Sequence, residues 1–164
     1  MVSPLTKIRL YLAVFIVGLV ASGITAFPLL TELNLLCRIL GVADVQSASG
    51  YSGLVWWILH VREGLTVTYG HYPFVAYGTD WLAFGHLVIA IFFIGPLLDP
   101  VRNIGVLYAG LIASVAVFPL ALICGPIRGI PFYWRLIDCS FGVGGFIVLW
   151  AALTLTKQIA VKAD

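Results

Sequence analysis

The chain has 164 residues, of which 62% are hydrophobic and only 10% are charged. Soluble globular domains carry about 25% charged residues, so this composition excludes an ordinary soluble domain and indicates an integral membrane protein. The net charge of +2 is too small to indicate nucleic-acid binding. Four spans of about 20 residues each would leave room only for connections, so we expect one membrane domain over residues 1–164.

The first long apolar stretch predicts a membrane span over residues 8–30. Gly18, Ser22 and Ala26 recur in it with the small-residue spacing that lets two helix backbones pack closely in lipid. The same spacing recurs in two later pairs: Gly110 with Ser114, and Ser140 with Gly144. These patterns predict packing surfaces and imply no chemistry.

The longest connection, residues 31–78, contains two short amphipathic segments separated by a linker rich in Ser, Gly and Ala. Residues 31–41 place leucines on one helical face, and residues 54–65 repeat this pattern beside Trp56 and Trp57. Both segments are too short to span a membrane, and tryptophan favours the lipid headgroup zone. We therefore expect two interfacial helices here.

Three further spans are predicted at 79–98, 104–124 and 136–155. The short link between the second and third spans requires an antiparallel helical hairpin. Pro119 should bend the third span near its end. The expected fold class is therefore all-α: a polytopic bundle of four transmembrane helices with short interfacial helices on its outer face.

The cationic side chains predict an orientation for this bundle. With both termini cytoplasmic, the inner face carries Lys7, Arg9, Arg102, Lys157 and Lys162, all close to span ends. The opposite face carries four arginines and no lysine. The positive-inside rule thus favours cytoplasmic termini.

This topology brings most of the remaining polar side chains to one end of the bundle. They are His60, Arg62, Glu63, His71, Asp80, His86, Arg128, Arg135 and Asp138. Arg135 and Asp138 are three residues apart on a predicted helix, so they can pair. Asp138 shares a helical face with Gly142 and Gly145, which points its carboxylate inward, where it needs a cation or hydrogen-bond donors.

One interpretation of this cluster is structural. Arginines and carboxylates would hold the interfacial helices on the bundle, and His86 would bond to a backbone carbonyl or a neighbouring side chain. The protein would then be a small subunit or an assembly or stabilising factor of a larger membrane complex. Its partners would be the lipid bilayer and other membrane subunits, or further copies of itself.

A second interpretation is a membrane-embedded enzyme or binding protein. Arg62, Arg128 and Arg135 could hold a lipid head group, a quinone-like carbonyl or a haem propionate, because arginine suits phosphate and carboxylate. His86 or Glu63 could then act as an acid or base. The three arginines and His86, with Asp80 and Asp138, form the candidate ligand-binding set, and whether the protein is an enzyme stays open.

A third interpretation is a metal or haem site. His60 and Glu63 form an H-x-x-E pair on one helical face. His71, Asp80 and His86 could complete a shell of nitrogen and oxygen ligands. The spacing is weak evidence, since a polar stripe on an interfacial helix explains the pair equally well. The three cysteines show no metal-ligand spacing, although a disulfide between Cys124 and Cys139 stays open. No cofactor follows from the residues.

Two runs carry a resemblance, FGHLVIAIFFIGPLLDPVRN at residues 84–103 and ICGPIRGIPFYWRLIDCSFG at residues 123–142. They resemble a group of small bacterial membrane proteins with no known activity. The resemblance implies four spans in a bacterial inner membrane and assigns no catalytic residue. The CxxC motif of vitamin K epoxide reductase-like proteins is not present.

Overall fold

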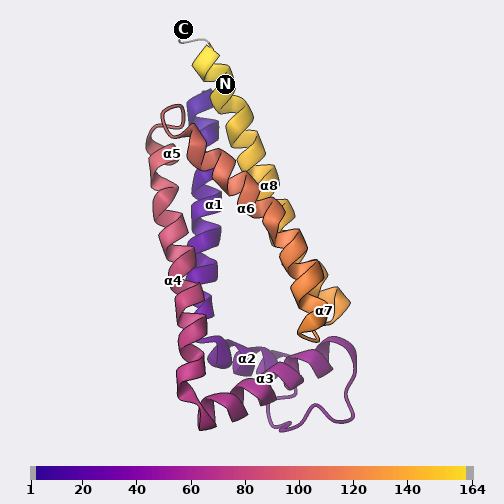
Figure 1. Cartoon of the computed structure of the whole chain (residues 1–164). Coiled ribbons are helices and arrows are strands. Elements are labelled where there is room, and N and C mark those ends of the chain that lie inside the picture. Colours follow the sequence, from indigo (N-terminus) through magenta and orange to yellow (C-terminus); the bar gives the residue numbers. More distant parts are fainter. Residues whose placement is uncertain (1–2, 162–164) are drawn as a thin grey trace. The chain divides into compact units, whose positions relative to one another are not determined.

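The structure, a computed structural model, describes residues 3–161, and every regular element in this range is a helix (Figure 1). The α-helices are α1 (Pro4–Ala26), α2 (Leu29–Ile39), α3 (Gly53–His71), α4 (Ala76–Phe92), α5 (Ile94–Leu98), α6 (Ile104–Pro119), α7 (Gly125–Ile127) and α8 (Phe132–Val161). A 3-10 turn, η1, covers Pro73–Val75, and a π-helix, η2, covers Leu120–Cys124. The all-α prediction is confirmed for these residues. Lys162, expected on the inner face, lies outside them.

Within residues 3–161, four helical segments are long and apolar enough to cross a membrane: Pro4–Ala26, Pro73–Leu98, Ile104–Ile127 and Phe132–Val161. The first, with 23 residues, is about 35 Å long at about 1.5 Å per residue. That length exceeds the bilayer's hydrocarbon thickness of about 30 Å. The prediction of four apolar spanning segments is therefore confirmed by length and composition.

The boundaries of these segments differ from the predicted ones. The first helix ends at Ala26, before Pro28, and α2 begins at Leu29. A proline inside a helix removes a backbone hydrogen bond, which favours a break at this point. The second segment begins earlier than predicted, because η1 leads directly into α4. The third continues through η2 and α7 to Ile127.

Two compact units can be distinguished within the chain. The terminal unit comprises Met1–Leu19 and Ile89–Asp164, and the central unit comprises Val20–Val88. Each unit has an apolar core of its own.

The core of the terminal unit joins α1, α6 and α8. Ile8, Leu12, Leu107 and Leu149 have no exposed surface there, and Phe93, between α4 and α5, packs with them. Figure 1 shows α6 running beside α8. This packing fixes the relative position of the helices that carry the pocket described below.

Glycines bring α6 and α8 together. A Cβ atom at Gly142 would lie 2.7 Å from the Ser114 carbonyl oxygen, and one at Gly110 would lie 2.6 Å from the Phe93 ring. The predicted packing pair Gly110 and Ser114 is therefore confirmed.

The predicted pair on α8 is wrong. Ser140 is exposed, and a Cβ at Gly144 would meet nothing within 4 Å. The buried face of α8 instead passes through Gly142 and contains Leu149 and Thr156. A four-residue spacing of small residues does not reveal which helical face is buried. In α8, small residues lie both on the face of Ser140 and Gly144 and on the face of Gly142.

The small-residue pattern in α1 also differs from its prediction. A Cβ at Gly18 would meet nothing within 4 Å, and Ser22 is exposed. Gly23 is buried instead, and a Cβ there would lie 3.0 Å from the Ala83 carbonyl oxygen. Gly23 thus makes the close contact in the central unit.

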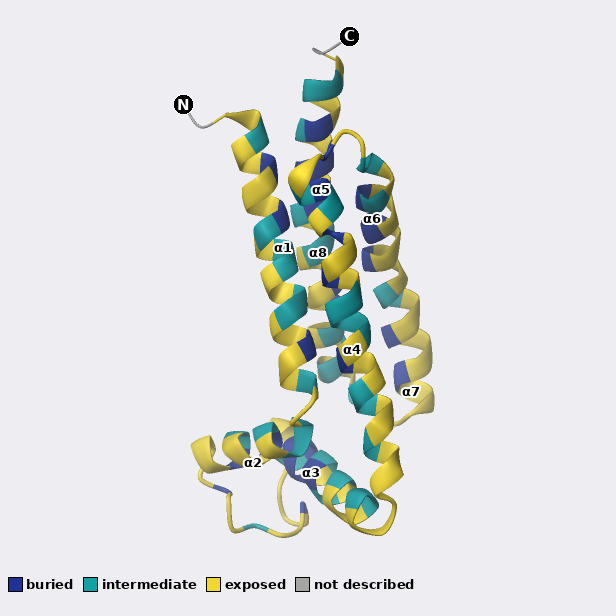
Figure 2. Ribbon diagram, turned by 90° about the vertical axis from the view of Figure 1, so that its left-hand side faces the viewer, coloured by how far each residue is buried: buried dark blue, intermediate teal, exposed yellow. Residues whose placement is uncertain are grey.

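The central unit contains helices at both predicted positions, α2 with 11 residues and α3 with 19, so α3 extends beyond the predicted residues 54–65. Their shared core includes Leu33, Cys37, Ile58 and Leu59, which are buried where the two helices meet (Figure 2). Leu40, predicted to share the apolar face of Leu33, lies beyond the end of α2 and is exposed. The structure confirms helices at these positions.

The third apolar segment changes helix type at Pro119. The α-helix ends there, and η2 continues as a wider π turn before α7. Proline cannot donate a backbone hydrogen bond and its ring crowds the preceding turn, so a local change of helix geometry is expected. The predicted irregularity is present as a π segment, a feature frequent at functional sites.

Candidate functional site

The polar cluster expected from the sequence is divided between the two units. Of the six candidate ligand-binding residues, Arg62, Asp80 and His86 belong to the central unit. Arg128, Arg135 and Asp138 belong to the terminal unit. The six residues therefore form two separate sets of three, one in each unit.

Arg62 is committed to the backbone of the central unit. Its side chain is only 8% exposed on α3. One guanidinium nitrogen donates a hydrogen bond to the Ala43 carbonyl at 3.1 Å, and the other donates to the Val45 carbonyl. Both carbonyls lie in the connection between α2 and α3, so Arg62 fastens this connection to α3.

Glu63 and His60 also serve local structure. The Glu63 carboxylate accepts a hydrogen bond from the Ala48 backbone N–H at 3.3 Å, in the connection that Arg62 fastens. The His60 ring stacks on Trp56 with the ring centroids 5.0 Å apart. The H-x-x-E pair therefore does not act together on a shared ligand in this structure.

His71 and His86 bond to carbonyls of their own helices. The Nδ1 atom of His71 lies 2.9 Å from the Val67 carbonyl oxygen, and that of His86 lies 2.8 Å from the Leu82 carbonyl oxygen. A carbonyl oxygen only accepts hydrogen bonds, so each Nδ1 carries the proton and donates it. The structural interpretation predicted this bond for His86.

The weak metal hypothesis gains no support from the geometry. In residues 3–161, no three His, Cys, Asp or Glu side chains gather closely enough to hold a metal ion. The set His60, Glu63, His71 and His86 is therefore not assembled. Asp80, half-buried in α4, has no hydrogen bond or ion pair within the described part of the chain.

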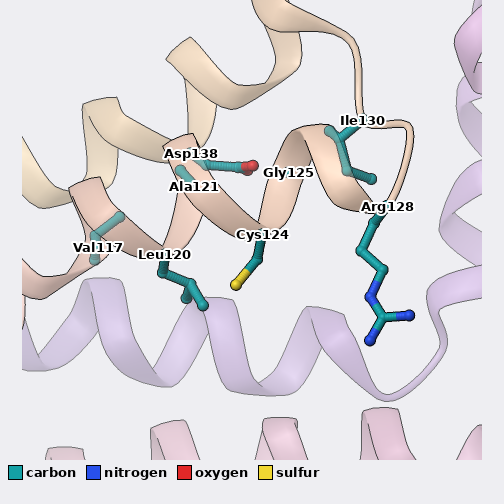
Figure 3. A pocket seen from close by; sticks show the side chains of 8 residues that line it. All are labelled: Val117, Leu120, Ala121, Cys124, Gly125, Arg128, Ile130 and Asp138. Atoms are coloured by element: carbon teal, nitrogen blue, oxygen red, sulfur yellow. The ribbon is translucent and has the colours of Figure 1, made fainter.

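The terminal unit contains a pocket beside the π segment, with a volume of about 240 Å³ (Figure 3). Two of the predicted ligand-binding residues, Asp138 and Arg128, line this pocket. Its lining residues are Val117, Leu120, Ala121, Cys124, Gly125, Arg128, Ile130 and Asp138. The wall is thus mainly apolar, with one carboxylate and one guanidinium.

The predicted pair between Arg135 and Asp138 does not form. The Arg135 side chain instead lies against Gly125, where its Cδ atom leaves no room for a Cβ. Its guanidinium carbon lies 5.2 Å from the Phe132 ring centroid. Helical side chains lean toward the N-terminus of their helix, which directs Arg135 toward Phe132 and away from Asp138. The Arg135 Nε atom is buried without a hydrogen-bond partner.

Asp138 consequently has no partner within residues 3–161. Its side chain is half-buried and makes no hydrogen bond or ion pair in this range. Arg128 is exposed, and Figure 3 shows its side chain extending away from the Asp138 carboxylate. The two charged groups at this pocket are therefore both open to groups from outside the chain.

Two residues of this pocket, Arg128 and Asp138, were predicted as ligand-binding candidates. Cys124 and Gly125 also line it but were not candidates, and only Pro119 signalled an irregular helix nearby. The disulfide left open between Cys124 and Cys139 is not present: both are free thiols, Cys124 exposed and Cys139 buried.

Comparison of the chain with protein-family models, with curated proteins and with solved structures gave no match in any of the three. The resemblance to small bacterial membrane proteins therefore stays a prediction.

Proposed function

We propose that the protein is a small non-catalytic subunit, or an assembly or stabilising factor, of a larger membrane complex. The observation that carries this proposal is the role of the polar groups in the central unit. Arg62, Glu63, His71 and His86 each bond to the backbone of this chain. Groups held in this way stabilise a scaffold and are poorly placed to bind a substrate.

The surfaces of the long helices suit this role. In the most apolar window of each spanning segment, only 17–28% of the residues are buried within the chain. Figure 2 shows exposed residues along α1 and α8. Large apolar side chains such as Phe141 and Ile112 are 71% and 70% exposed. Such faces are available to lipid and to the helices of partner subunits, including further copies of this chain.

We place the protein in a bacterial inner membrane with both termini cytoplasmic. Lys7, Arg9, Arg102 and Lys157 then share the cytoplasmic side, in agreement with the positive-inside rule. The connection that contains α2 and α3 faces outward. On α2, Leu35 and Ile39 are 56% and 73% exposed, which supports an interfacial position for this helix.

The alternative function is a membrane-embedded enzyme or a binding protein for a lipid, a quinone or a haem-like ligand. The pocket beside the π segment supports binding. Its volume of about 240 Å³ lies below the range of about 300–1,000 Å³ usual for small-molecule sites. It therefore suits part of a larger amphiphile better than a whole cofactor.

Extraction in a mild detergent followed by native mass analysis tests the subunit proposal. We expect most of this 17.8 kDa chain to travel in a much heavier particle that contains other membrane proteins. A photo-reactive residue at the exposed position 141 or 112 should cross-link to those partners. The same group at the buried Leu149 is the matched control and should cross-link only within the chain. Recovery of the chain solely as a monomer would contradict the proposal.

A further inference from the structure

Asp138 lies near the N-terminal end of α8. The helix α8 has 30 residues, about 45 Å at about 1.5 Å per residue, so it exceeds the hydrocarbon thickness of about 30 Å. An untilted α8 centred on the bilayer would extend about 8 Å past the hydrocarbon at each end, so its second turn would lie at the boundary with the headgroups. Asp138 lies about 9 Å from the first residue of α8, Phe132, by the same rise per residue. Aromatic residues at this end favour the membrane interface.

The Asp138 carboxylate needs a partner that the described chain does not supply. A half-buried carboxylate beside apolar walls is costly unless a cation or hydrogen-bond donors compensate it. Arg135, the nearest candidate on α8, is turned away onto Gly125 and Phe132. A cationic donor from outside the protein would meet this need.

Arg128 supplies the opposite charge at the same pocket. It lines the pocket and is exposed, and its side chain has no hydrogen bond or ion pair within residues 3–161. A guanidinium group suits phosphate oxygens, which it binds through paired N–H groups. Beside Asp138, on the side away from Arg128, Val117 and Leu120 provide an apolar wall for hydrocarbon (Figure 3).

We infer that this pocket binds a zwitterionic phospholipid whose headgroup carries a primary ammonium, of the phosphatidylethanolamine type. The ammonium donates hydrogen bonds to Asp138, the phosphate accepts them from Arg128, and the adjoining hydrocarbon lies along Leu120. Phosphatidylcholine also carries a positive nitrogen, but this nitrogen has no N–H donor. Phosphatidylglycerol has no cation in its headgroup. Asp138 therefore distinguishes headgroups, whereas Arg128 binds the phosphate that all three share. This inference goes beyond the proposed subunit role and does not depend on it.

Native mass spectrometry of the full chain tests this binding. The protein is incubated in mixed micelles with equal amounts of palmitoyl-oleoyl phosphatidylethanolamine, phosphatidylcholine and phosphatidylglycerol, and the bound lipids are quantified. We expect phosphatidylethanolamine to be retained on the order of tenfold over phosphatidylcholine, as one charge-assisted hydrogen bond provides. Asp138→Asn should abolish this preference. Arg128→Gln should weaken retention of all three lipids without changing their ratio.

Arg102→Gln is the matched control, because Arg102 is exposed in the same unit but does not line the pocket. It should leave both retention and preference unchanged. Equal retention of the ethanolamine and choline lipids by the unaltered chain would overturn the inference, as would a preference that survives in Asp138→Asn. If that variant fails to fold, the unaltered chain can be tested with ethanolamine lipids whose headgroup nitrogen is methylated stepwise. Their retention relative to phosphatidylcholine should fall with each N–H that is lost. Unchanged retention across the series would overturn the inference.

Discussion

Gly142→Ala is expected to destabilise the terminal unit by about 1–3 kcal/mol, the usual penalty for overpacking a tight interface. The new methyl group would lie 2.7 Å from the Ser114 carbonyl oxygen, so the backbones of α6 and α8 must separate. Phe118 and Val117, which each lie 3.3 Å from the same Cβ position, leave little space for adjustment. Reversible unfolding in mixed micelles measures the change.

Gly144→Ala is the matched control for this substitution. It lies two residues away on the same helix, and its Cβ would meet nothing within 4 Å. Both substitutions improve intrinsic helix propensity by about 1 kcal/mol, so the difference between them isolates helix packing. Gly144→Ala should be neutral or stabilising. Equal stability of the two variants would show that α6 and α8 do not pack as described.

Arg62→Ala is expected to destabilise the central unit by about 3 kcal/mol, because hydrogen bonds from a charged group contribute about 1.5–3 kcal/mol each. The substitution leaves the Ala43 and Val45 carbonyls without their donor. The connection between α2 and α3 should then loosen. Hydrogen exchange of the backbone amides of residues 42–48 should accelerate, which mass spectrometry detects.

Arg38→Ala serves as the control, since Arg38 is an exposed arginine of the same unit. Its effect should stay within about 0.5 kcal/mol, as for most surface substitutions. If Arg62→Ala keeps both the stability and the exchange protection of the original chain, Arg62 has no structural role. The enzyme or ligand-binding interpretation of that residue would then regain its basis.

The apolar helices could be predicted because the signal is local: a long run without charges suffices to indicate a spanning segment. The same holds for α2 and α3, whose apolar residues repeat with helical spacing. The ends of the helices were predicted less accurately than their positions. The break at Pro28 and the early start of the second segment at η1 depend on local backbone geometry, which composition does not reveal.

The details of the site depended on contacts between distant residues. Arg135 has the correct spacing to pair with Asp138, yet it lies over Gly125, a neighbour that no helical pattern reveals. Arg62 could equally have bound a phosphate, and only the position of the Ala43 and Val45 carbonyls shows its role. The choice between the Ser140 and Gly142 faces of α8 likewise depended on where α6 lies.

Cysteine labelling in sealed spheroplasts tests most directly the central claim that the chain crosses the membrane four times. Single cysteines replace the exposed Gln46, Arg102 and Arg128 in a Cys124→Ala background, since Cys37 and Cys139 are buried. An impermeant maleimide added outside should label positions 46 and 128, and position 102 only after permeabilisation. Labelling of positions 46 and 128 from opposite sides of the membrane would contradict the account.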